Sequence, residues 1–437
     1  MAYSFGYEGK SGGMVQLVAD RSDRTYTFMS LPPGEVTLFM CAKDMWNLRT
    51  CKSKVVTVEE QAISDEVLTA GADLLAATKA AGDVEATTVL AMQQAASLQA
   101  ADVSVARRQE LADSLTTTLV DVLDTDDVAS VNVMAVVEGL ASTTADAAAV
   151  SEAAADQVLA GLGSATSILE QQVAAGQEVA PEQLSSVLGV YSQTLSTRFT
   201  APAADSGGAT NGTVAAEEAT AAAEVRNEVA ASLGRMASIV AASMAPGMED
   251  VSSFSGEAGS ALGFTTRKDF SEFITSANPI SAAPPATPAA RRHLLQAAEA
   301  PVLRMPDGFA AACDDNPTTC SSPTTITFKY QDDPTLYEIS IGGKEALVRG
   351  IEAATDGAIV SGVADVSSPS ITRFVSRIGG DLELDLPLIA SKTSAGQTHE
   401  CMRLDQDTGY LTKVGVVTAP KATPKATAVT CVGDRLG

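Results

Sequence analysis

The chain has 437 residues, enough for two or three domains, and its 54 acidic and 29 basic side chains leave a formal net charge of −25. This charge has the wrong sign for a phosphate backbone, so the composition excludes a general nucleic-acid-binding protein. Between residues 61 and 250 the sequence holds 26 acidic and only 6 basic residues, which places most of the charge in one middle segment.

Residues 1–60 have the alternation and turn residues of β-structure. The run TYTFMSL at 25–31 predicts a strand, LPPGE predicts a turn, and the runs at 35–42 and 52–58 predict the two arms of a hairpin. Cys41 and Cys51 lie on these arms at similar distances from the turn. A cross-strand disulfide is therefore sterically reasonable if the two side chains face each other.

From about residue 64 to residue 245 the pattern changes to helix, with breaks that predict about six helices in a bundle or layered array. Three stretches show apolar stripes at helical spacing: Leu111, Leu115, Leu119 and Val122; Leu184, Leu188, Tyr191 and Leu195; Val225, Val229, Leu233, Met236 and Val240. Each stripe predicts a face that packs against a neighbouring helix. Alanine-rich faces bury little area, so we expect marginal stability.

Residues 278–301 are rich in Pro and Ala, and they predict an exposed, extended linker. Beyond it, short alternating runs separated by turn residues predict an antiparallel sandwich. The run at 381–390 places Asp381, Glu383 and Asp385 on one face and leucines on the other, as in a half-exposed strand.

The six cysteines fall in three near pairs: Cys41 and Cys51, Cys313 and Cys320, Cys401 and Cys431. This spacing favours disulfides within separate modules of a chain in an oxidising compartment. Six thiols of a cytosolic chain, or a metal site, are the alternatives. No C-x₂-C pair is present and the two histidines, His293 and His399, are not spaced as ligands.

The acidic clusters and the two histidines are best interpreted as solvated surface groups and not as metal-binding or catalytic residues. The acidic cluster Asp124, Asp126 and Asp127 lacks the ligand spacing of a calcium-binding loop, as does the pair Asp314 and Asp315. Neither histidine belongs to a nucleophile–base motif. We therefore expect no enzyme activity, no cofactor and no metal. Asn211 begins an N-glycosylation sequon, which has meaning in a secreted chain.

The C-terminal stretch from Cys401 resembles the GPS motif that ends the GAIN domains of polycystin-like proteins and adhesion receptors. Cys401 and Cys431 match the outer cysteines of that motif, and Thr430 precedes the late cysteine. The resemblance implies a disulfide between them. The family cleaves itself at a His-Leu/Ser-Thr step, where this chain has Arg435, Leu436 and Gly437. These residues offer neither base nor nucleophile, so we expect a degenerate motif without autoproteolysis.

Residues 31–58 resemble the last strands of a PKD or REJ (receptor for egg jelly) module, on Leu31, Pro33, Gly34, Asp44 and Val58. Such modules precede GAIN domains in polycystin-like proteins. The phrase ARRHLLQ at 290–296 resembles a linker of secreted green-algal proteins.

Together these observations predict a multidomain α+β protein: a partial PKD/REJ-like β-sandwich (1–60), an Ala-rich helical region (61–250), a linker-bearing segment (251–322) and a GAIN-like antiparallel β-sandwich (323–437). The resemblance implies a non-catalytic adhesion or mechanosensory stalk on the extracellular side of a plasma or ciliary membrane. It would belong to a larger ion-channel or receptor chain and contact an extracellular protein or glycan. The alternative is a cytosolic, acidic helical scaffold that binds partners through its helices.

Overall fold

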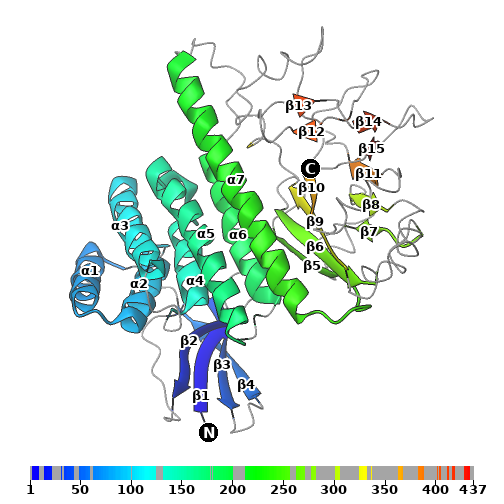
Figure 1. Ribbon diagram of the computed structural model, residues 1–437. Coiled ribbons are helices and arrows are strands. Elements are labelled where there is room, and N and C mark those ends of the chain that lie inside the picture. Colours follow the sequence, from blue (N-terminus) through cyan, green and yellow to red (C-terminus); the bar gives the residue numbers. More distant parts are fainter. Residues whose placement is uncertain are drawn as a thin grey trace. The chain divides into compact units, whose positions relative to one another are not determined.

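Figure 1 shows the computed structural model of the chain. The structure describes residues 2–8, 14–21, 31, 34–43, 49–59, 63–99, 101–124, 131–177, 179, 181–199, 212–255, 262–270, 277–281, 301–305, 324–331, 336, 363–367, 382–387, 401, 403–404, 411–412, 416–418 and 428–433. The chain divides into two compact units, unit 1 (Met1–Arg198) and unit 2 (Phe199–Gly437).

Both units combine helices with antiparallel strands, which confirms the α+β class at its coarse level. The division between units falls inside the segment 61–250 that the sequence suggested as one helical region. The domain boundaries and the β-sandwich assignments drawn from the sequence stay predictions.

Unit 1 begins with a four-stranded antiparallel sheet in the order β2-β1-β3-β4. Its strands are β1 (Ala2–Glu8), β2 (Met14–Arg21), β3 (Gly34–Lys43) and β4 (Arg49–Val58). Strands β3 and β4 form the expected hairpin, and ten residues of each are paired without a bulge. The predicted strand at 25–31 lies outside the described residues except for Leu31.

One face of this sheet packs against the helices. Tyr7 of β1 and Val36 of β3 form a buried cluster with Met92 and Ala135, and the Tyr7 hydroxyl donates to Met92 Sδ at 3.8 Å. Strand β4 is different, because seven of the nine residues whose exposure is described are exposed, and no described strand pairs with its outer edge. Val56 and Val58 of β4 also pack against this cluster, so the sheet is anchored by β1, β3 and the end of β4, and only the outer edge of β4 is open.

Six α-helices follow among the described residues of unit 1. They are α1 (Asp65–Ala80), α2 (Val84–Gln99), α3 (Val105–Leu123), α4 (Val133–Thr143), α5 (Glu152–Ala174) and α6 (Pro181–Arg198), with a short 3₁₀ turn, η2 (Ala147–Ala149), before α5. The seventh described α-helix, α7 (Gly212–Ser243), belongs to unit 2.

Local sequence fixes where these helices begin and end. Ser104, Asn132 and Ser151 precede α3, α4 and α5, and each side chain accepts from the backbone N–H three residues later. Helix α1 ends before Gly82, whose φ of +73° is a conformation that glycine adopts without the cost of a Cβ. Capping residues thus mark the short connections that stack consecutive helices side by side.

The apolar stripes expected on the helices are buried, with one partial exception. The four residues on α3 and the four on α6 are each at most 8% exposed, and Leu119 and Leu188 are fully buried. On α7, Val225 is half-buried, whereas Val229, Leu233, Met236 and Val240 are buried. Helical periodicity therefore identified the packing faces correctly.

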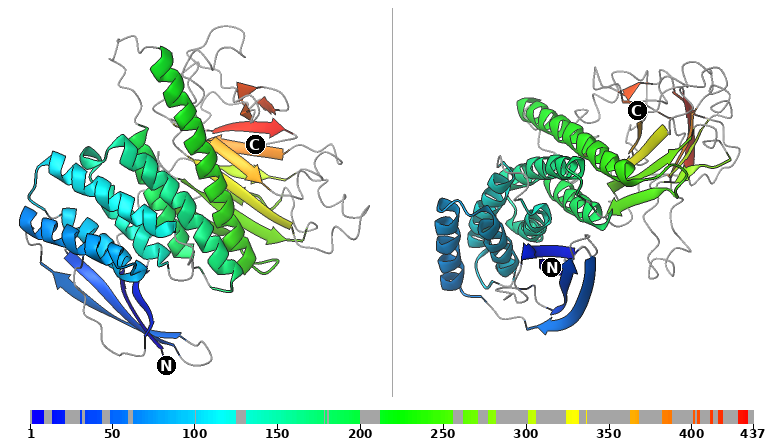
Figure 2. Two further views of the ribbon diagram at one scale, coloured as in Figure 1. Left: turned by 60° about the vertical axis from the view of Figure 1, so that its left-hand side comes forward. Right: turned by 60° about the horizontal axis from the view of Figure 1, so that its bottom comes forward.

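In unit 2, α7 packs against β6 (Leu262–Asp269) and β9 (Thr324–Gln331). These strands belong to an antiparallel sheet in the order β10-β9-β6-β5, with β5 (Val251–Ser255) and β10 (Val363–Ser367) at its edges. Figure 2 shows α7 lying across this sheet. Lys268 donates from Nζ to the carbonyl of Ala241 at 2.9 Å. A lysine of β6 therefore provides a hydrogen-bond donor for a backbone carbonyl in the last turn of α7.

A buried arginine ties the start of β5 to β6. The Arg267 guanidinium makes a two-pronged ion pair with Asp250, with both N–O distances at 2.7 Å, and also donates to the carbonyls of Asn278 and Pro279. Its side chain is only 7% exposed. This network holds the approach to β7 (Ile280–Ser281) against the sheet.

A second sheet of unit 2 has the order β14-β15-β11-β8-β7. Its strands besides β7 are β8 (Val302–Arg304), β11 (Leu382–Pro387), β14 (Val416–Thr418) and β15 (Ala428–Gly433), and β12 (Arg403–Leu404) pairs separately with β13 (Leu411–Thr412). On β11, Glu383 is exposed and Leu384 is buried, in agreement with the predicted half-exposed strand.

The expectation of an exposed linker over 278–301 is wrong at Ile280 and at Pro301, whereas Asn278, Pro279 and Ser281 are exposed as expected. Ile280 is fully buried and pairs with Leu303 of β8, and Pro301 is also buried. The physical reason is that Ile280 contributes an apolar side chain to the second sheet, while Arg267 holds the residues just before it. The Pro-rich residues 282–300 lie outside the described part of the chain.

Candidate functional site

The first disulfide lies in the N-terminal sheet, where Cys41 of β3 is bonded to Cys51 of β4. The two residues are direct partners in the antiparallel register, so the bond joins adjacent strands. Cys41 is 2% exposed, whereas Cys51 is exposed. A thiol reagent in solution can therefore reach this bond from the Cys51 side.

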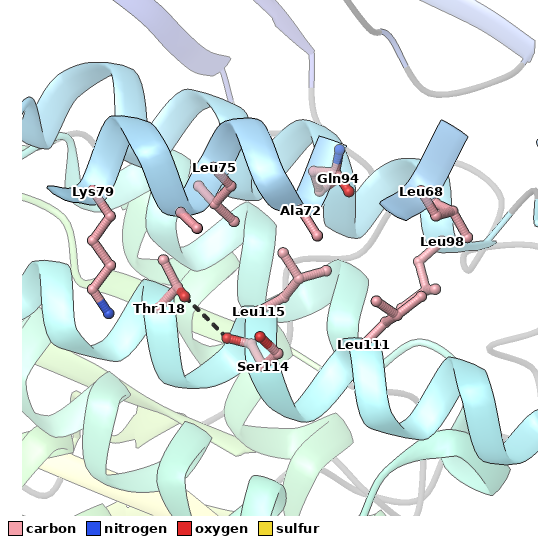
Figure 3. A pocket seen from close by; sticks show the side chains of 11 residues that line it. Leu68, Ala72, Leu75, Lys79, Gln94, Leu98, Leu111, Ser114, Leu115 and Thr118 are labelled. Carbon is pink, nitrogen blue, oxygen red and sulfur yellow. Dashed lines mark hydrogen bonds between the residues drawn. The ribbon is translucent and has the colours of Figure 1, made fainter. Parts of the chain in front are cut away.

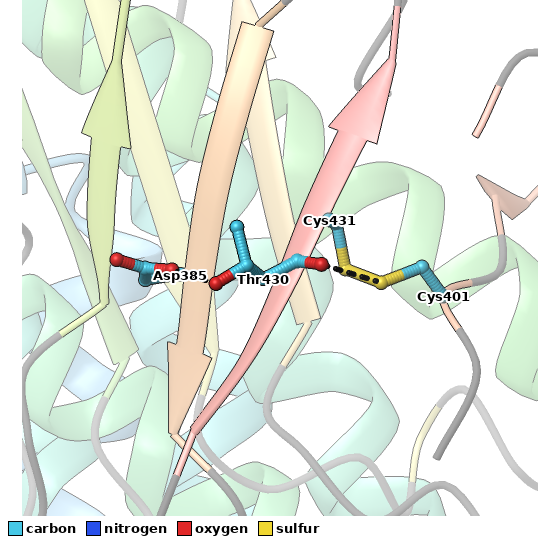
Figure 4. The surroundings of a disulfide bond; sticks show 4 residues. All are labelled: Asp385, Cys401, Thr430 and Cys431. Atoms are coloured by element: carbon cyan, nitrogen blue, oxygen red, sulfur yellow. Dashed lines mark hydrogen bonds between the residues drawn. A yellow bond between two sulfur atoms is a disulfide. The ribbon is translucent and has the colours of Figure 1, made fainter. Parts of the chain in front are cut away.

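The second disulfide joins Cys401 to Cys431 of β15, with their Cα atoms 5.6 Å apart (Figure 4). Both cysteines are 5% exposed. Cys431 is the direct partner of Leu384, which is also buried, so the bond lies on the apolar face of the sheet. It fastens the segment that begins at Cys401 to a strand 30 positions away.

The opposite face of the same strands carries a polar bridge. The Asp385 carboxylate accepts from the Thr430 hydroxyl and from Arg304 Nη1, the latter at 2.5 Å (Figure 4 labels Asp385 and Thr430). Both carboxylate oxygens are engaged and the arginine balances the charge. This arrangement links β8, β11 and β15 across the sheet, and we interpret it as structural rather than as a base aimed at a substrate.

The other residues singled out by the sequence lie outside the described part of the chain: Asn211, His293, Cys313, Cys320, His399, Arg435, Leu436 and Gly437. The glycosylation site, the third cysteine pair and the degenerate cleavage motif therefore stay predictions. Of the acidic clusters, Asp124 alone is described, and it caps the C-terminus of α3.

A groove that the sequence did not indicate lies between α1 and α3. Arg107 near the start of α3 pairs with Asp65 at the start of α1 at 3.0 Å, and Asp121 near the end of α3 pairs with Lys79 near the end of α1 at 2.6 Å. The two helices therefore run parallel, and both pack against α2, which connects them. The space between them is a cavity of about 240 Å³.

The floor of the groove is apolar. Five buried leucines line it from the three helices: Leu68 and Leu75 of α1, Leu98 of α2, and Leu111 and Leu115 of α3. Figure 3 shows the α1 and α3 side chains facing each other across the space. The small side chains of Ala72 and Ala76 leave this space open on the α1 side.

Polar groups gather along the rim and at one end. Lys79 lines one end of the groove, Thr118 lies nearest to it on α3, and Ser114 lies one helical turn further toward the centre (Figure 3). The Gln94 amide reaches α1 at Gly71, where Nε2 lies 1.4 Å from the position that a Cβ would occupy. Glycine at position 71 is therefore what allows this amide to close the α1–α2 side.

The sequence carried a signal for the leucines but none for the cavity. Leu68, Ala72, Leu75 and Lys79 follow the 4-3-4 spacing of one helix face, and that pattern alone predicts a packed interface. The cavity arises because α1 and α3 pack mainly against α2 and contact each other through ion pairs near their ends, and because the α1 face has alanines at its centre.

The described residues contain no cluster of three or more His, Cys, Asp or Glu side chains arranged to hold a metal ion. Among the described helices, none is both long and apolar enough to cross a membrane.

Comparison of the chain with family models and with curated proteins finds no significant match.

Proposed function

We propose that this chain is a non-catalytic extracellular stalk region, with an adhesion or mechanosensory role, of a larger polycystin-like membrane protein. The observation that carries the proposal is the pair of disulfides at Cys41–Cys51 and Cys401–Cys431. Disulfides form and persist in secreted and cell-surface proteins and are rare in the cytosol. The two bonds favour an oxidising compartment, and the proposal assigns the chain to the extracellular side of a plasma or ciliary membrane.

The position of the bonds supports a load-bearing role. The first joins two paired strands of one sheet, and the second joins strand β15 to a residue outside the sheet. A covalent link between Cys401 and Cys431 holds the intervening residues out of any force path that runs along the chain. The resemblance of the C-terminal residues to a GPS motif, and of residues 31–58 to a PKD or REJ module, favours the same context.

Expression with a secretion signal in eukaryotic cells tests the compartment. We expect non-reducing peptide mapping to recover Cys41 linked to Cys51 and Cys401 linked to Cys431. We also expect a glycan on Asn211 that disappears in the matched variant Asn211→Gln. Secreted, folded material with these four cysteines as free thiols would overturn the proposal.

A cell-surface assay tests the role. The chain is fused to an unrelated transmembrane helix, displayed on non-adherent cells, and exposed to shear over immobilised extracellular matrix proteins and glycans. We expect retention of the cells under flow, and loss of retention for the variant in which Cys401 and Cys431 are both replaced by alanine. Equal retention of cells displaying an unrelated domain would contradict adhesion.

A second candidate is a cytosolic acidic scaffold that binds partners through its helices. It is favoured by two exposed apolar side chains on α1, Val67 at 61% and Leu74 at 51% exposure. Expression in a reducing cytosol separates the two proposals. The scaffold predicts a soluble, helical protein with all cysteines reduced, whereas the stalk predicts that unit 2 fails to reach a stable fold without its disulfide.

A further inference from the structure

We propose that the groove between α1 and α3 binds a single-chain aliphatic carboxylate of medium length, the chemistry of a free fatty acid. The proposal is independent of the compartment assigned above, because it rests only on unit 1. Its occupant follows from three properties of the groove: its volume, its length, and the charge at one end.

The volume and the lining fit an alkyl chain. A cavity of about 150 Å³ lined by aliphatic and aromatic side chains stays dry and accommodates a benzene molecule. The groove is larger, at about 240 Å³, and its five leucines present only hydrocarbon to the interior. Water in this space would have few hydrogen-bond partners along the floor, so an apolar ligand replaces it favourably.

The length fits a chain of about ten carbons. Leu68 and Lys79 mark the ends of the groove along α1 (Figure 3), and at about 1.5 Å of helical rise per residue the distance between them is about 16 Å. An extended alkyl chain with bonds of about 1.5 Å advances about 1.3 Å per bond, so ten carbons span about 12 Å. This leaves room for the head group at the Lys79 end.

The charge at that end selects an anion. Lys79 lines the groove, whereas its ion-pair partner Asp121 does not. Both side chains of this pair are nearly half exposed, which makes the pair weak, and the ammonium has three N–H donors. A carboxylate at the end of the groove can accept hydrogen bonds from the Lys79 ammonium, next to Thr118 on α3.

The net charge of −25 acts in the opposite direction, because it lowers the local concentration of anions. Affinity therefore comes from burial of the alkyl chain, and the choice of head group comes from Lys79. This division of roles makes the proposal testable with ligands that share a tail and differ in the head.

The test is titration calorimetry of the full chain with decanoate and 1-decanol, both below their aggregation concentrations. We expect one decanoate per chain and a negative heat-capacity change, as apolar burial requires. Decanol is expected to bind about tenfold more weakly. No saturable decanoate binding to the wild-type chain, or equal affinities for the two ligands, would overturn the proposal.

Two variants locate the tail. Ala72→Phe fills the centre of the groove, and we expect it to weaken decanoate binding at least tenfold. Ala77→Phe adds the same ring on α1 at an exposed position that does not line the groove, and we expect binding within twofold of wild type. Equal effects of the two variants would show that decanoate binds elsewhere. Circular dichroism checks that both variants stay folded.

Two further variants separate the head-group role of Lys79 from its structural role. Lys79→Met removes the ammonium and the link between α1 and α3, whereas Asp121→Asn removes the link and keeps the ammonium. We expect Lys79→Met to weaken decanoate about tenfold and leave decanol within twofold. Asp121→Asn should bind decanoate at least as tightly as wild type. If Asp121→Asn reproduces the loss, Lys79 acts only through the ion pair and the proposal is wrong.

Discussion

Removing each disulfide should lower the stability of one unit only, and by different amounts. For the bond between Cys401 and Cys431, which spans 30 positions, the loop-closure relation gives about 3.6 kcal/mol at 25 °C. For the bond between Cys41 and Cys51, which spans 10 positions, the same relation gives about 2.7 kcal/mol. Each estimate applies to replacement of both cysteines by alanine.

Hydrogen exchange read by mass spectrometry in a urea series measures both units in one experiment. Peptides from α4 report on unit 1 and peptides from β6 report on unit 2, because both elements are buried within their own unit. We expect the Cys401→Ala/Cys431→Ala variant to lose protection in β6 and keep it in α4. The Cys41→Ala/Cys51→Ala variant should show the reverse pattern, with the smaller loss.

Mild reduction of the wild-type chain provides the matching control. Cys51 is exposed whereas Cys401 and Cys431 are both buried, so a water-soluble reductant should open the first bond while unit 2 is still folded. The reasoning is refuted if the larger loss follows removal of the shorter loop. It is also refuted if the buried bond is reduced first.

Three further predictions concern single side chains. Gly139→Ala should destabilise unit 1 by about 1–3 kcal/mol in urea denaturation, because the new Cβ would lie 2.8 Å from Cδ1 of the fully buried Leu119; an unchanged midpoint would contradict this packing. Asp250→Ala should cost unit 2 about 3–5 kcal/mol, because it leaves the buried Arg267 charge without its carboxylate, and a cost below about 1 kcal/mol would show that the guanidinium finds water. Burial, followed by the nearby charge of Glu138, raises the pKa of Tyr7, so its contribution to stability is complete below about pH 10 and is lost as the pH rises further; Tyr7→Phe should flatten the alkaline fall in the urea midpoint, and parallel curves would argue against a buried phenol.

Much of the secondary structure could be predicted from the sequence because it depends on local spacing. The α3 and α6 stripes and the β3–β4 hairpin follow from period and turn chemistry, and the register that pairs Cys41 with Cys51 follows from their equal distance from the turn. Strands β5 to β8 were not predicted. They are short, and β6 and β8 pair with strands that lie 55 to 83 residues away along the chain, so no local pattern marks these pairings.

The groove between α1 and α3 could not be predicted for a related reason. Its leucines are visible in the sequence, but a helix face with Leu68 and Leu75 predicts contact with a neighbour whether or not space remains between the two helices. The space depends on α1 and α3 sharing α2 as their common support. That arrangement is set by tertiary packing and by small residues such as Ala72. A hydrophobic pattern records that alanine is apolar, but it does not record that its small side chain leaves space unfilled.

The outer edge of β4 has a consequence for how the chain behaves when concentrated. Ten residues in regular extended conformation offer their outward backbone groups to any further strand, and unprotected edges of this kind polymerise into fibrils. Lys52 and Lys54 are exposed on the same face of this edge, so two copies that align there bring like charges together. An acidic extended peptide meets no such repulsion. Repulsion between these lysines therefore disfavours pairing of two β4 edges, whereas pairing of β4 with an acidic strand is not disfavoured in this way.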